Sequence, residues 1–302
     1  MVRSRMIYDI TLKISYHYPQ AVKDARHILR IRPREDAEQK VTAQSVKVLP
    51  TPDEAAVDRD FFGNGIDHIR LHRPHEQLMV EMRARVAVAS RRTEGTDGRT
   101  LADIRVAALN SRAADAEAPA HFLGASRLVP PLLPASDYLK CHARSASTGG
   151  EAVLAMTQQI HADFAYTPGA TRIDTPVEEV FGSRKGVCQD FAHLMIAGLR
   201  AGGIPAAYVS GFLRTDPPPG RPRLEGRDAM HAWVKVWLGP VTGWVGFDPT
   251  NGIVASADHI EVAIGRDYAD VAPVSGVLVT SGSQRMRHAV DVIPLDEREA
   301  GE

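Results

Sequence analysis

Three residues in the second half of the chain have side chains that together could carry out nucleophilic catalysis. Cys188 starts a segment whose apolar residues have helical spacing, and a helix N-terminus stabilises a thiolate through its dipole and free N–H groups. His231 comes early in a predicted strand, directly after a polar loop, where an imidazole could take up the thiol proton. Asp248 ends the next predicted strand and could fix the tautomer of that imidazole.

Each of these residues, taken singly, also has an ordinary structural interpretation. A lone cysteine on an apolar helix face is commonly inert, a single histidine can be satisfied inside a core, and an aspartate before a proline commonly forms a turn. A nucleophile at a helix start, followed by a base and an acid on successive strands, is a much rarer combination. We therefore interpret Cys188, His231 and Asp248 as a catalytic triad.

Residues beside the predicted triad could complete an active site. Gly186 would let a substrate backbone approach closely, because it has no side chain. The amide of Gln189 could donate to an oxyanion, although a surface position on the helix explains this residue equally well. Trp233 and Trp244 could wall a cleft or pack in a core. Asp190 is expected to be structural, because an acidic residue in the first turn favours the helix dipole.

Metal-dependent and serine-dependent chemistry are both poorly supported by the sequence. Cys188, His193, His231 and Asp248 could be combined as metal ligands, but they include no short-spaced C-x-x-C or H-x-x-x-H pair. His193 lies off the helix face of Cys188 and is expected to be structural. The G-x-S-x-G motif of serine hydrolases does not occur. We therefore expect no metal and no cofactor.

The elements that must position the triad follow an α+β order. A helix and three strands are predicted at residues 187–201, 206–213, 230–238 and 244–248. An earlier helix is predicted at 151–164, so that residues 149–265 form the predicted catalytic core. The proline-rich stretch 214–228 is predicted to be a polar loop, because it has too many prolines for a buried element.

Residues 1–90 are predicted to form a separate β-rich domain. Apolar and polar residues alternate over 6–18, and four similar segments follow at 26–31, 41–49, 67–71 and 78–88. Residues 91–148 are predicted to be a helical and extended linker, with an Ala-rich helix at 101–122 and extended backbone around Pro130, Pro131 and Pro134. Residues 266–302 are predicted to be a C-terminal tail with strands that pack back on the body.

Composition excludes several classes of function. The 302 residues include 36 basic and 37 acidic side chains, so a net charge of -1 favours no interaction with nucleic acid. The sequence contains no apolar run of about 18 residues, as a membrane span requires, and its N-terminal residues are not expected to form a signal peptide. Two cysteines, Cys141 and Cys188, are too few for a disulfide framework. We expect a cytoplasmic protein without a membrane partner, and its oligomeric state is left open.

Three motifs resemble the core of the transglutaminase-like superfamily of bacterial cysteine proteins. They are residues 186–193 (GVCQDFAH), 231–233 (HAW) and 244–251 (WVGFDPTN). Residues 60–64 (DFFGN), with the strands around them, resemble the β-rich N-terminal domain that often accompanies this core. Residues 265–273 resemble the C-terminal part of the same architecture. The resemblance therefore extends over most of the chain.

This resemblance implies a papain-like core, in which the nucleophile helix packs on an antiparallel sheet, and a thioester between Cys188 and a peptide or protein acyl donor. It also implies an aromatic oxyanion donor from the region of Tyr166, for which ordinary packing is the alternative. We slightly prefer hydrolysis of a peptide, isopeptide or amide bond. Transfer to an amine, as in a protein-glutamine transglutaminase, is one alternative. A non-catalytic peptide-binding module is another, although such a module would not need a complete triad.

Overall fold

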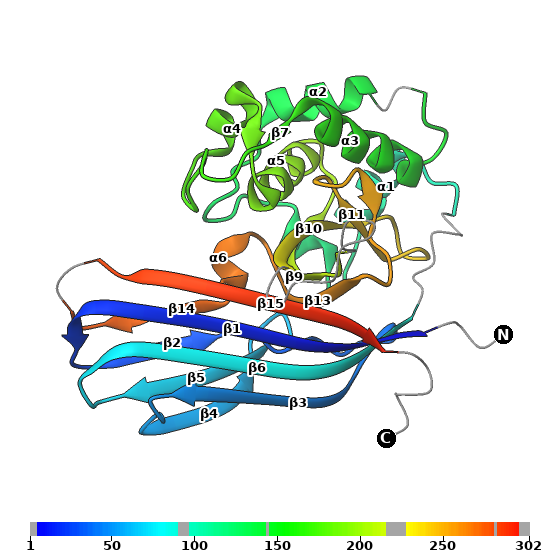
Figure 1. Cartoon of the computed structure of the whole chain (residues 1–302). Helices are drawn as coiled ribbons and strands as arrows, with labels where there is room; N and C mark the ends of the chain where they lie inside the picture. Colours follow the sequence, from blue (N-terminus) through cyan, green and yellow to red (C-terminus); the bar gives the residue numbers. More distant parts are fainter. Residues whose placement is uncertain (1–4, 90–96, 143–144, 216–227, 281–282, 296–302) are drawn as a thin grey trace, which may run out of the picture.

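The protein has two parts, a long β-sandwich and a unit of helices and a sheet that lies against it (Figure 1). The computed structural model describes residues 5–89, 97–142, 145–215, 228–280 and 283–295. Within these residues, no helix combines the length and hydrophobicity needed to cross a bilayer. The predicted α+β class and the packing of helices on an antiparallel sheet are confirmed.

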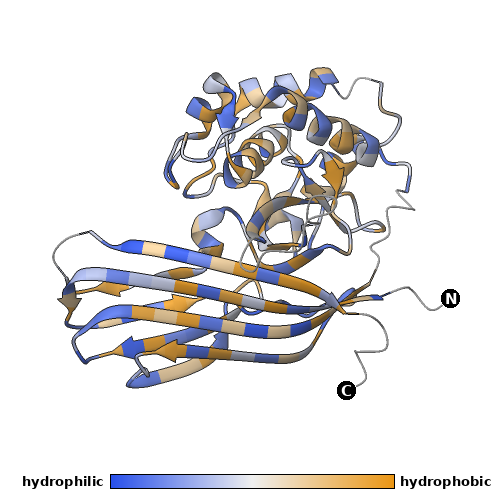
Figure 2. Cartoon of the chain, in the orientation of Figure 1, coloured by the Kyte–Doolittle hydropathy of each residue, from blue (hydrophilic) through white to orange (hydrophobic). Residues whose placement is uncertain are grey.

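The sandwich consists of two four-stranded antiparallel sheets. The first has the order β15-β1-β6-β3, formed by Arg285–Leu295, Arg5–Val22, His75–Ala89 and Gln39–Leu49. The second has the order β14-β2-β5-β4, formed by Val274–Leu278, Ala25–Leu29, Gly65–Leu71 and Glu54–Arg59. The predicted alternation in β1 buries every second side chain, including Tyr8, Ile10, Leu12 and Ile14. Figure 2 shows apolar and polar residues alternating along these strands.

Strands from both ends of the chain build the sandwich. β15 pairs with β1 from Ile7 opposite Leu295 to His17 opposite Arg285, and β14 pairs with β2. The sandwich is therefore larger than the β-rich unit predicted from residues 1–90 alone, because local periodicity does not reveal which distant strands pair. The periodicity also missed β4, whose side chains are all exposed and so do not alternate.

The second part is a five-stranded antiparallel sheet with helices packed on it. The order is β12-β11-β10-β9-β13, formed by Ile253–Val254, Trp244–Asp248, Ala229–Trp237, Ala206–Leu213 and His259–Gly265. Helix α5, Cys188–Ala201, packs on β9 and β10, and its apolar residues fill the core between them. Three further helices pack on α5: α2 (Leu133–His142), α3 (Gly149–Asp163) and α4 (Val177–Ser183).

The predicted linker contains helices that belong to this second part. The predicted helix at 101–122 is correct only for α1, Leu101–Leu109, and a 3₁₀ turn, η1, occupies Pro119–Phe122. The extended backbone predicted around Pro134 is wrong, because α2 begins at Leu133. Pro134 lies in the first turn of α2, where a proline fits because its missing N–H would have no partner within the helix.

Two buried amides connect the sandwich to β13. Gln39 donates from Nε2 to the carbonyl of Glu261 at 2.8 Å and accepts from the Glu261 N–H at 2.8 Å. Asn64 likewise donates from Nδ2 to the carbonyl of Ile264 and accepts at Oδ1 from the Ile264 N–H, each at 2.8 Å. Both amide side chains are completely buried. The sandwich thereby fixes the strand that begins at His259, which contributes to the site described below.

Candidate active site

Cys188 is the first residue of α5, and its side chain is half-buried. The N–H of Val187 donates to Oδ2 of Asp190 at 2.8 Å, and the Thr171 hydroxyl donates to the same oxygen at 2.6 Å. Asp190 therefore closes the start of the helix, and burial raises the pKa of its carboxyl group. A Cβ atom on Gly186 would lie 2.8 Å from the Cβ of Asp190. The close contact with Asp190 therefore explains why residue 186 is glycine, and the close approach of a substrate is not needed to explain it.

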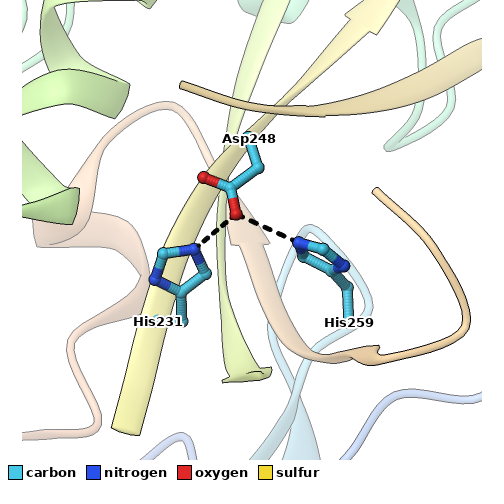
Figure 3. Close-up of side chains that lie close together, drawn as sticks. All are labelled: His231, Asp248 and His259. Carbon is cyan, nitrogen blue, oxygen red and sulfur yellow. Dashed lines mark hydrogen bonds and ion pairs between the residues drawn. The ribbon is translucent and has the colours of Figure 1, made fainter. Parts of the chain in front are cut away.

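His231 and Asp248 lie on adjacent antiparallel strands, β10 and β11. Nε2 of His231 lies 2.8 Å from Oδ2 of Asp248, and both side chains are buried (Figure 3). Because a carboxylate only accepts hydrogen bonds, Nε2 carries a proton and Nδ1 remains for the Cys188 thiol. The same imidazole also makes a hydrogen bond with Cys188, so the structure brings the three predicted triad residues together from α5, β10 and β11.

Burial and electrostatics act in opposite directions on the two charged partners. Burial lowers the pKa of His231, but hydrogen bonds to Asp248 and Cys188, together with their charges, raise it to about 10. Burial raises the pKa of Asp248, but hydrogen bonds from His231, His259 and Asn251 hold it well below its usual range. The pair therefore consists of an imidazolium and a carboxylate at neutral pH.

Asp248 has additional partners that sequence analysis missed. Oδ2 also accepts from Nε2 of His259 at 3.1 Å and from Nδ2 of Asn251 at 2.6 Å. Oδ1 accepts from the backbone N–H groups of Thr250 at 2.9 Å and Asn251 at 3.2 Å. Asn251 belongs to the motif at 244–251, so its nearness to Asp248 could have been noticed. His259 lies on β13, and no spacing in the sequence connects it with the triad.

His231, Asp248 and His259 form a group with metal-binding side chains, and their possible ligand atoms lie within 4.8 Å of one another. The N–H of Ser256 donates to Nδ1 of His259 at 3.1 Å. The proton of a neutral His259 ring is therefore on Nε2, which leaves no lone pair there for a metal. Oδ2 of Asp248 is already shared by three donors. These residues fit a hydrogen-bond network better than a metal centre.

The Trp233 ring packs against the rings of His231 and His259 and does not line a cleft. Its side chain is fully buried, its ring stacks near His231 with centroids 6.1 Å apart, and it meets the His259 ring edge-on at 5.2 Å. A Cβ atom on Gly211 would lie 2.4 Å from the indole, and one on Gly246 would lie 3.5 Å from its Nε1. Of the two interpretations left open for Trp233, core packing is therefore the one that the structure supports.

Trp244 lies away from the triad, at the opposite end of β11 from Asp248. Its indole N–H donates to the carbonyl of Glu117 at 2.9 Å, and its ring packs edge-on against Phe122 at 5.0 Å. The interpretation of Trp244 as a cleft wall is accordingly replaced by a role in attaching η1 to the sheet.

The predicted loop at 214–228 also borders the site in sequence, but residues 216–227 lie outside the described part of the chain.

The two candidate oxyanion donors come from different elements, Gln189 from α5 and Tyr166 from β7. Gln189 follows it in α5 and donates from Nε2 to the carbonyl of Ile173 at 3.0 Å, which connects the helix start to the preceding loop. Tyr166 lies in β7, Ala165–Tyr166, with 55% of its surface exposed. Burial, and after it the charge of Cys188, raise the pKa of Tyr166. Tyr166 is thus a protonated, accessible phenol close to the thiol, and one proton of the Gln189 amide is engaged elsewhere.

His193 occupies a structural position, on the buried side of α5. Its side chain is 3% exposed, and its Nε2 accepts from the N–H of Tyr268 at 3.2 Å. Burial lowers the pKa of His193 to about 4. The ring is therefore neutral at neutral pH and connects α5 to α6, Tyr268–Val271.

Two family descriptions match the two parts of the chain. Residues 8–87 match the bacterial transglutaminase-like N-terminal region, and residues 139–249 match the transglutaminase-like superfamily. The chain is also 34% identical over 303 residues to an uncharacterized protein of Mycobacterium tuberculosis, covering 96% of this chain and 93% of that protein. The chain belongs to the transglutaminase-like superfamily.

Two more distant relatives carry descriptions of activity. A protein-glutamine gamma-glutamyltransferase of Pseudomonas aeruginosa is 37% identical over 131 residues, which are 41% of this chain and 20% of that protein. The crystal structure of a proposed cysteine protease from Cytophaga hutchinsonii superposes with a TM-score of 0.75 over 97% of this chain and 92% of that one. Its sequence identity is 22%, so this likeness supports the fold.

Proposed function

We propose that the protein is a cysteine-dependent acyl-transfer enzyme with Cys188 as nucleophile, His231 as general acid and base, and Asp248 as the group that orients His231. The observation that carries the proposal is the hydrogen bond of 2.8 Å between His231 and Asp248, with Nδ1 of the same imidazole left for Cys188 at the start of α5. This arrangement activates a thiol by holding it as the thiolate of an ion pair.

In the first half of the reaction the Cys188 thiolate attacks the carbonyl carbon of an amide. The negative charge moves to the carbonyl oxygen, where N–H groups of the first turn of α5 and the Tyr166 hydroxyl would stabilise it. The C–N bond then breaks, and Nδ1 of His231 gives its proton to the leaving amine. The product of this half is a thioester on Cys188 and a neutral His231 that still donates from Nε2 to Asp248.

In the second half His231 takes a proton from the acceptor, which attacks the thioester and releases Cys188 as thiolate. Water as acceptor gives a carboxylic acid and makes the protein a peptidase or amidase, which we favour slightly. An amine as acceptor gives a new amide, and the similarity to the Pseudomonas aeruginosa transferase supports that alternative. A peptide-binding module without catalysis is less well supported, because binding alone does not require a buried histidine and carboxylate beside a thiol.

The test is to incubate the purified protein with a peptide library, with and without a primary amine, and to identify the products by mass spectrometry. We expect new carboxyl ends or new amides, together with an acyl adduct on Cys188. Cys188→Ala should abolish turnover, and His231→Ala should lower it by about three orders of magnitude or more. Unchanged turnover by the folded Cys188→Ala protein would contradict the proposal.

A further inference from the structure

Three hydrogen-bond donors converge on one oxygen of Asp248 (Figure 3 shows the two histidines). Oδ2 accepts from Nε2 of His231 at 2.8 Å, from Nε2 of His259 at 3.1 Å and from Nδ2 of Asn251 at 2.6 Å. Donors that share one acceptor atom compete for its negative charge, so each is held less strongly than it would be alone. His259 therefore influences how strongly Asp248 holds His231.

The orientation and tautomer of His259 are fixed by its surroundings. Its Nδ1 accepts from the Ser256 N–H at 3.1 Å, which leaves the ring proton on Nε2, directed at Asp248. The edge of Trp233 packs against the ring with centroids 5.2 Å apart, and the side chain is about 1% exposed. A buried ring held in this way donates to Asp248 as a neutral group of constant geometry.

We propose that His259 is a positioning residue of the active site, which acts as a neutral donor that limits how strongly Asp248 holds the His231 imidazolium. This inference rests on the proposed function, in which His231 must first keep a proton and then give it to the leaving amine. A histidine held too strongly as imidazolium is a poor acid, and a proton donor works best when its pKa is near the working pH. By donating to the same oxygen, His259 thus makes the ion pair of His231 and Asp248 less stable than it would be without this donor.

The groups that face His231 and Asp248 come from four elements. Cys188 faces His231 from α5, and the His259 ring lies 6.2 Å from the His231 ring between centroids. Asn251, a neutral donor from the turn after β11, faces Asp248. Further along β10 and β13, Lys235 and Glu261 neutralise each other in an ion pair of 2.7 Å. His259 is therefore the titratable group that shares an acceptor oxygen with His231, so its removal directly changes the electrostatic environment of that oxygen.

The direction of the effect follows from the N–H dipole. The positive end of the His259 N–H bond points at Oδ2, so its loss makes the environment of His231 more negative and raises the pKa of His231. His259→Phe keeps an aromatic ring of similar size without the donor, whereas His259→Gln keeps an N–H donor. We expect His259→Phe to raise the pKa of His231 by about half a unit to one unit, and His259→Gln to change it much less.

The experiment is a nuclear magnetic resonance titration of His231 in ¹³C-histidine-labelled full-length protein, with the signal assigned through His231→Ala. It is carried out in a Cys188→Ala background, where the thiolate no longer contributes to the imidazole titration. His17→Phe, at an exposed position on β1, is the matched control and should leave the titration unchanged. For proteins with an active thiol, the alkaline limb of kcat/KM should move upward in His259→Phe and stay near the wild-type value in His259→Gln. A correctly folded His259→Phe protein with an unaltered His231 titration would overturn the inference.

A second measurement needs no substitution, in case His259→Phe does not fold. Nitrogen-15 shifts of His259 in the wild-type protein should report a neutral ring with its proton on Nε2. A proton on Nδ1, or a charged ring at neutral pH, would also overturn the inference. Failure of the proposed function has a different signature: no Cys188-dependent product forms from peptides or amines, while the shift of the His231 titration in His259→Phe persists.

Discussion

A Cβ atom built on Gly186 would lie 2.8 Å from the Cβ of Asp190 and 2.9 Å from its Oδ2. Both distances are shorter than side chains tolerate, so the backbone before Cys188 can pass over Asp190 only because residue 186 is glycine. Asp190 in turn accepts from the Val187 N–H at 2.8 Å, which fixes the backbone next to the thiol. The position of the proposed nucleophile thus depends on a close contact between two residues that have no direct part in the chemistry.

Gly186→Ala should accordingly destabilise the protein by about 1–3 kcal/mol, since the added methyl group must displace the Asp190 side chain. It should also lower kcat/KM, because Cys188 moves with the helix start. Urea unfolding followed by circular dichroism measures the first effect. Gly182→Ala in α4 is the matched control, because a Cβ atom there has no neighbour within 4 Å. This variant should be more stable than the wild type by about 0.5–1 kcal/mol, since alanine is favoured over glycine inside a helix. Equal stability of the two variants would argue against the role of the contact.

Asp248→Asn should change the pH dependence of activity as well as its magnitude. The pKa of His231 is raised to about 10, so the imidazolium persists until the pH rises through that value. Without the carboxylate, His231 loses the hydrogen bond and the negative charge of Asp248, which both raise its pKa, so this pKa and with it the alkaline limb of kcat/KM should move to lower values. We expect kcat to fall by about 10²–10⁴-fold, because the amide of asparagine can also hold the wrong tautomer. A pH profile measured on both proteins tests this, and an unmoved alkaline limb would contradict the assignment of Asp248.

Alkylation should distinguish the two cysteines. Cys141 is exposed on α2, and Cys188 is half-buried in the first turn of α5, so access alone favours Cys141. A thiolate in an ion pair with His231 reverses that order, since only the thiolate reacts with iodoacetamide. At mildly acidic pH, peptide mapping by mass spectrometry should therefore find Cys188 labelled first.

His231→Ala should remove this preference without affecting the labelling of Cys141. A bulkier alkylating agent separates reactivity from access, because a narrow cleft would slow only its reaction with Cys188. Equal labelling of both cysteines by the small reagent at low pH would count against an activated thiol.

His193 should make the protein sensitive to acid. Its pKa is lowered to about 4 by burial, whereas in the unfolded chain it returns to the ordinary value near 6.5. The unfolded state therefore binds a proton more readily, and stability is lost as the pH falls from 6.5 through 4. The full effect is about 3 kcal/mol between pH 7 and pH 4.

His193→Gln keeps an acceptor for the Tyr268 N–H and cannot be protonated, so its free energy of unfolding should fall less steeply over this range. Urea titrations at several pH values measure the difference between the two proteins. His17→Gln, at an exposed position, is the control and should retain the slope of the wild-type protein. A slope for His193→Gln equal to that of the wild type would show that His193 does not carry the acid sensitivity.

Local signals in the sequence were sufficient for the elements that hold the proposed triad. The segment after Gly186 begins a helix at Cys188 because its apolar residues repeat with helical spacing, and Gly202 ends it. Trp244–Asp248 was predicted as a strand with its observed bounds, since Gly243 and Pro249 delimit it. Such signals depend on neighbouring residues only. They failed for α2, where three prolines suggested extended backbone although one of them lies within the first helical turn.

The sequence by itself determined which residues could act as nucleophile, base and orienting acid, because their order and the elements that carry them are local properties. The tertiary structure alone decided what surrounds them. Two strands, β10 and β9, lie between β11 and β13 in the sheet, yet His259 at the start of β13 bonds to Asp248 at the end of β11. Gly211 in β9 leaves space for the Trp233 indole, which packs against both histidine rings. Periodicity contains no information about such contacts, since they arise from strand order and from the space that a missing side chain leaves.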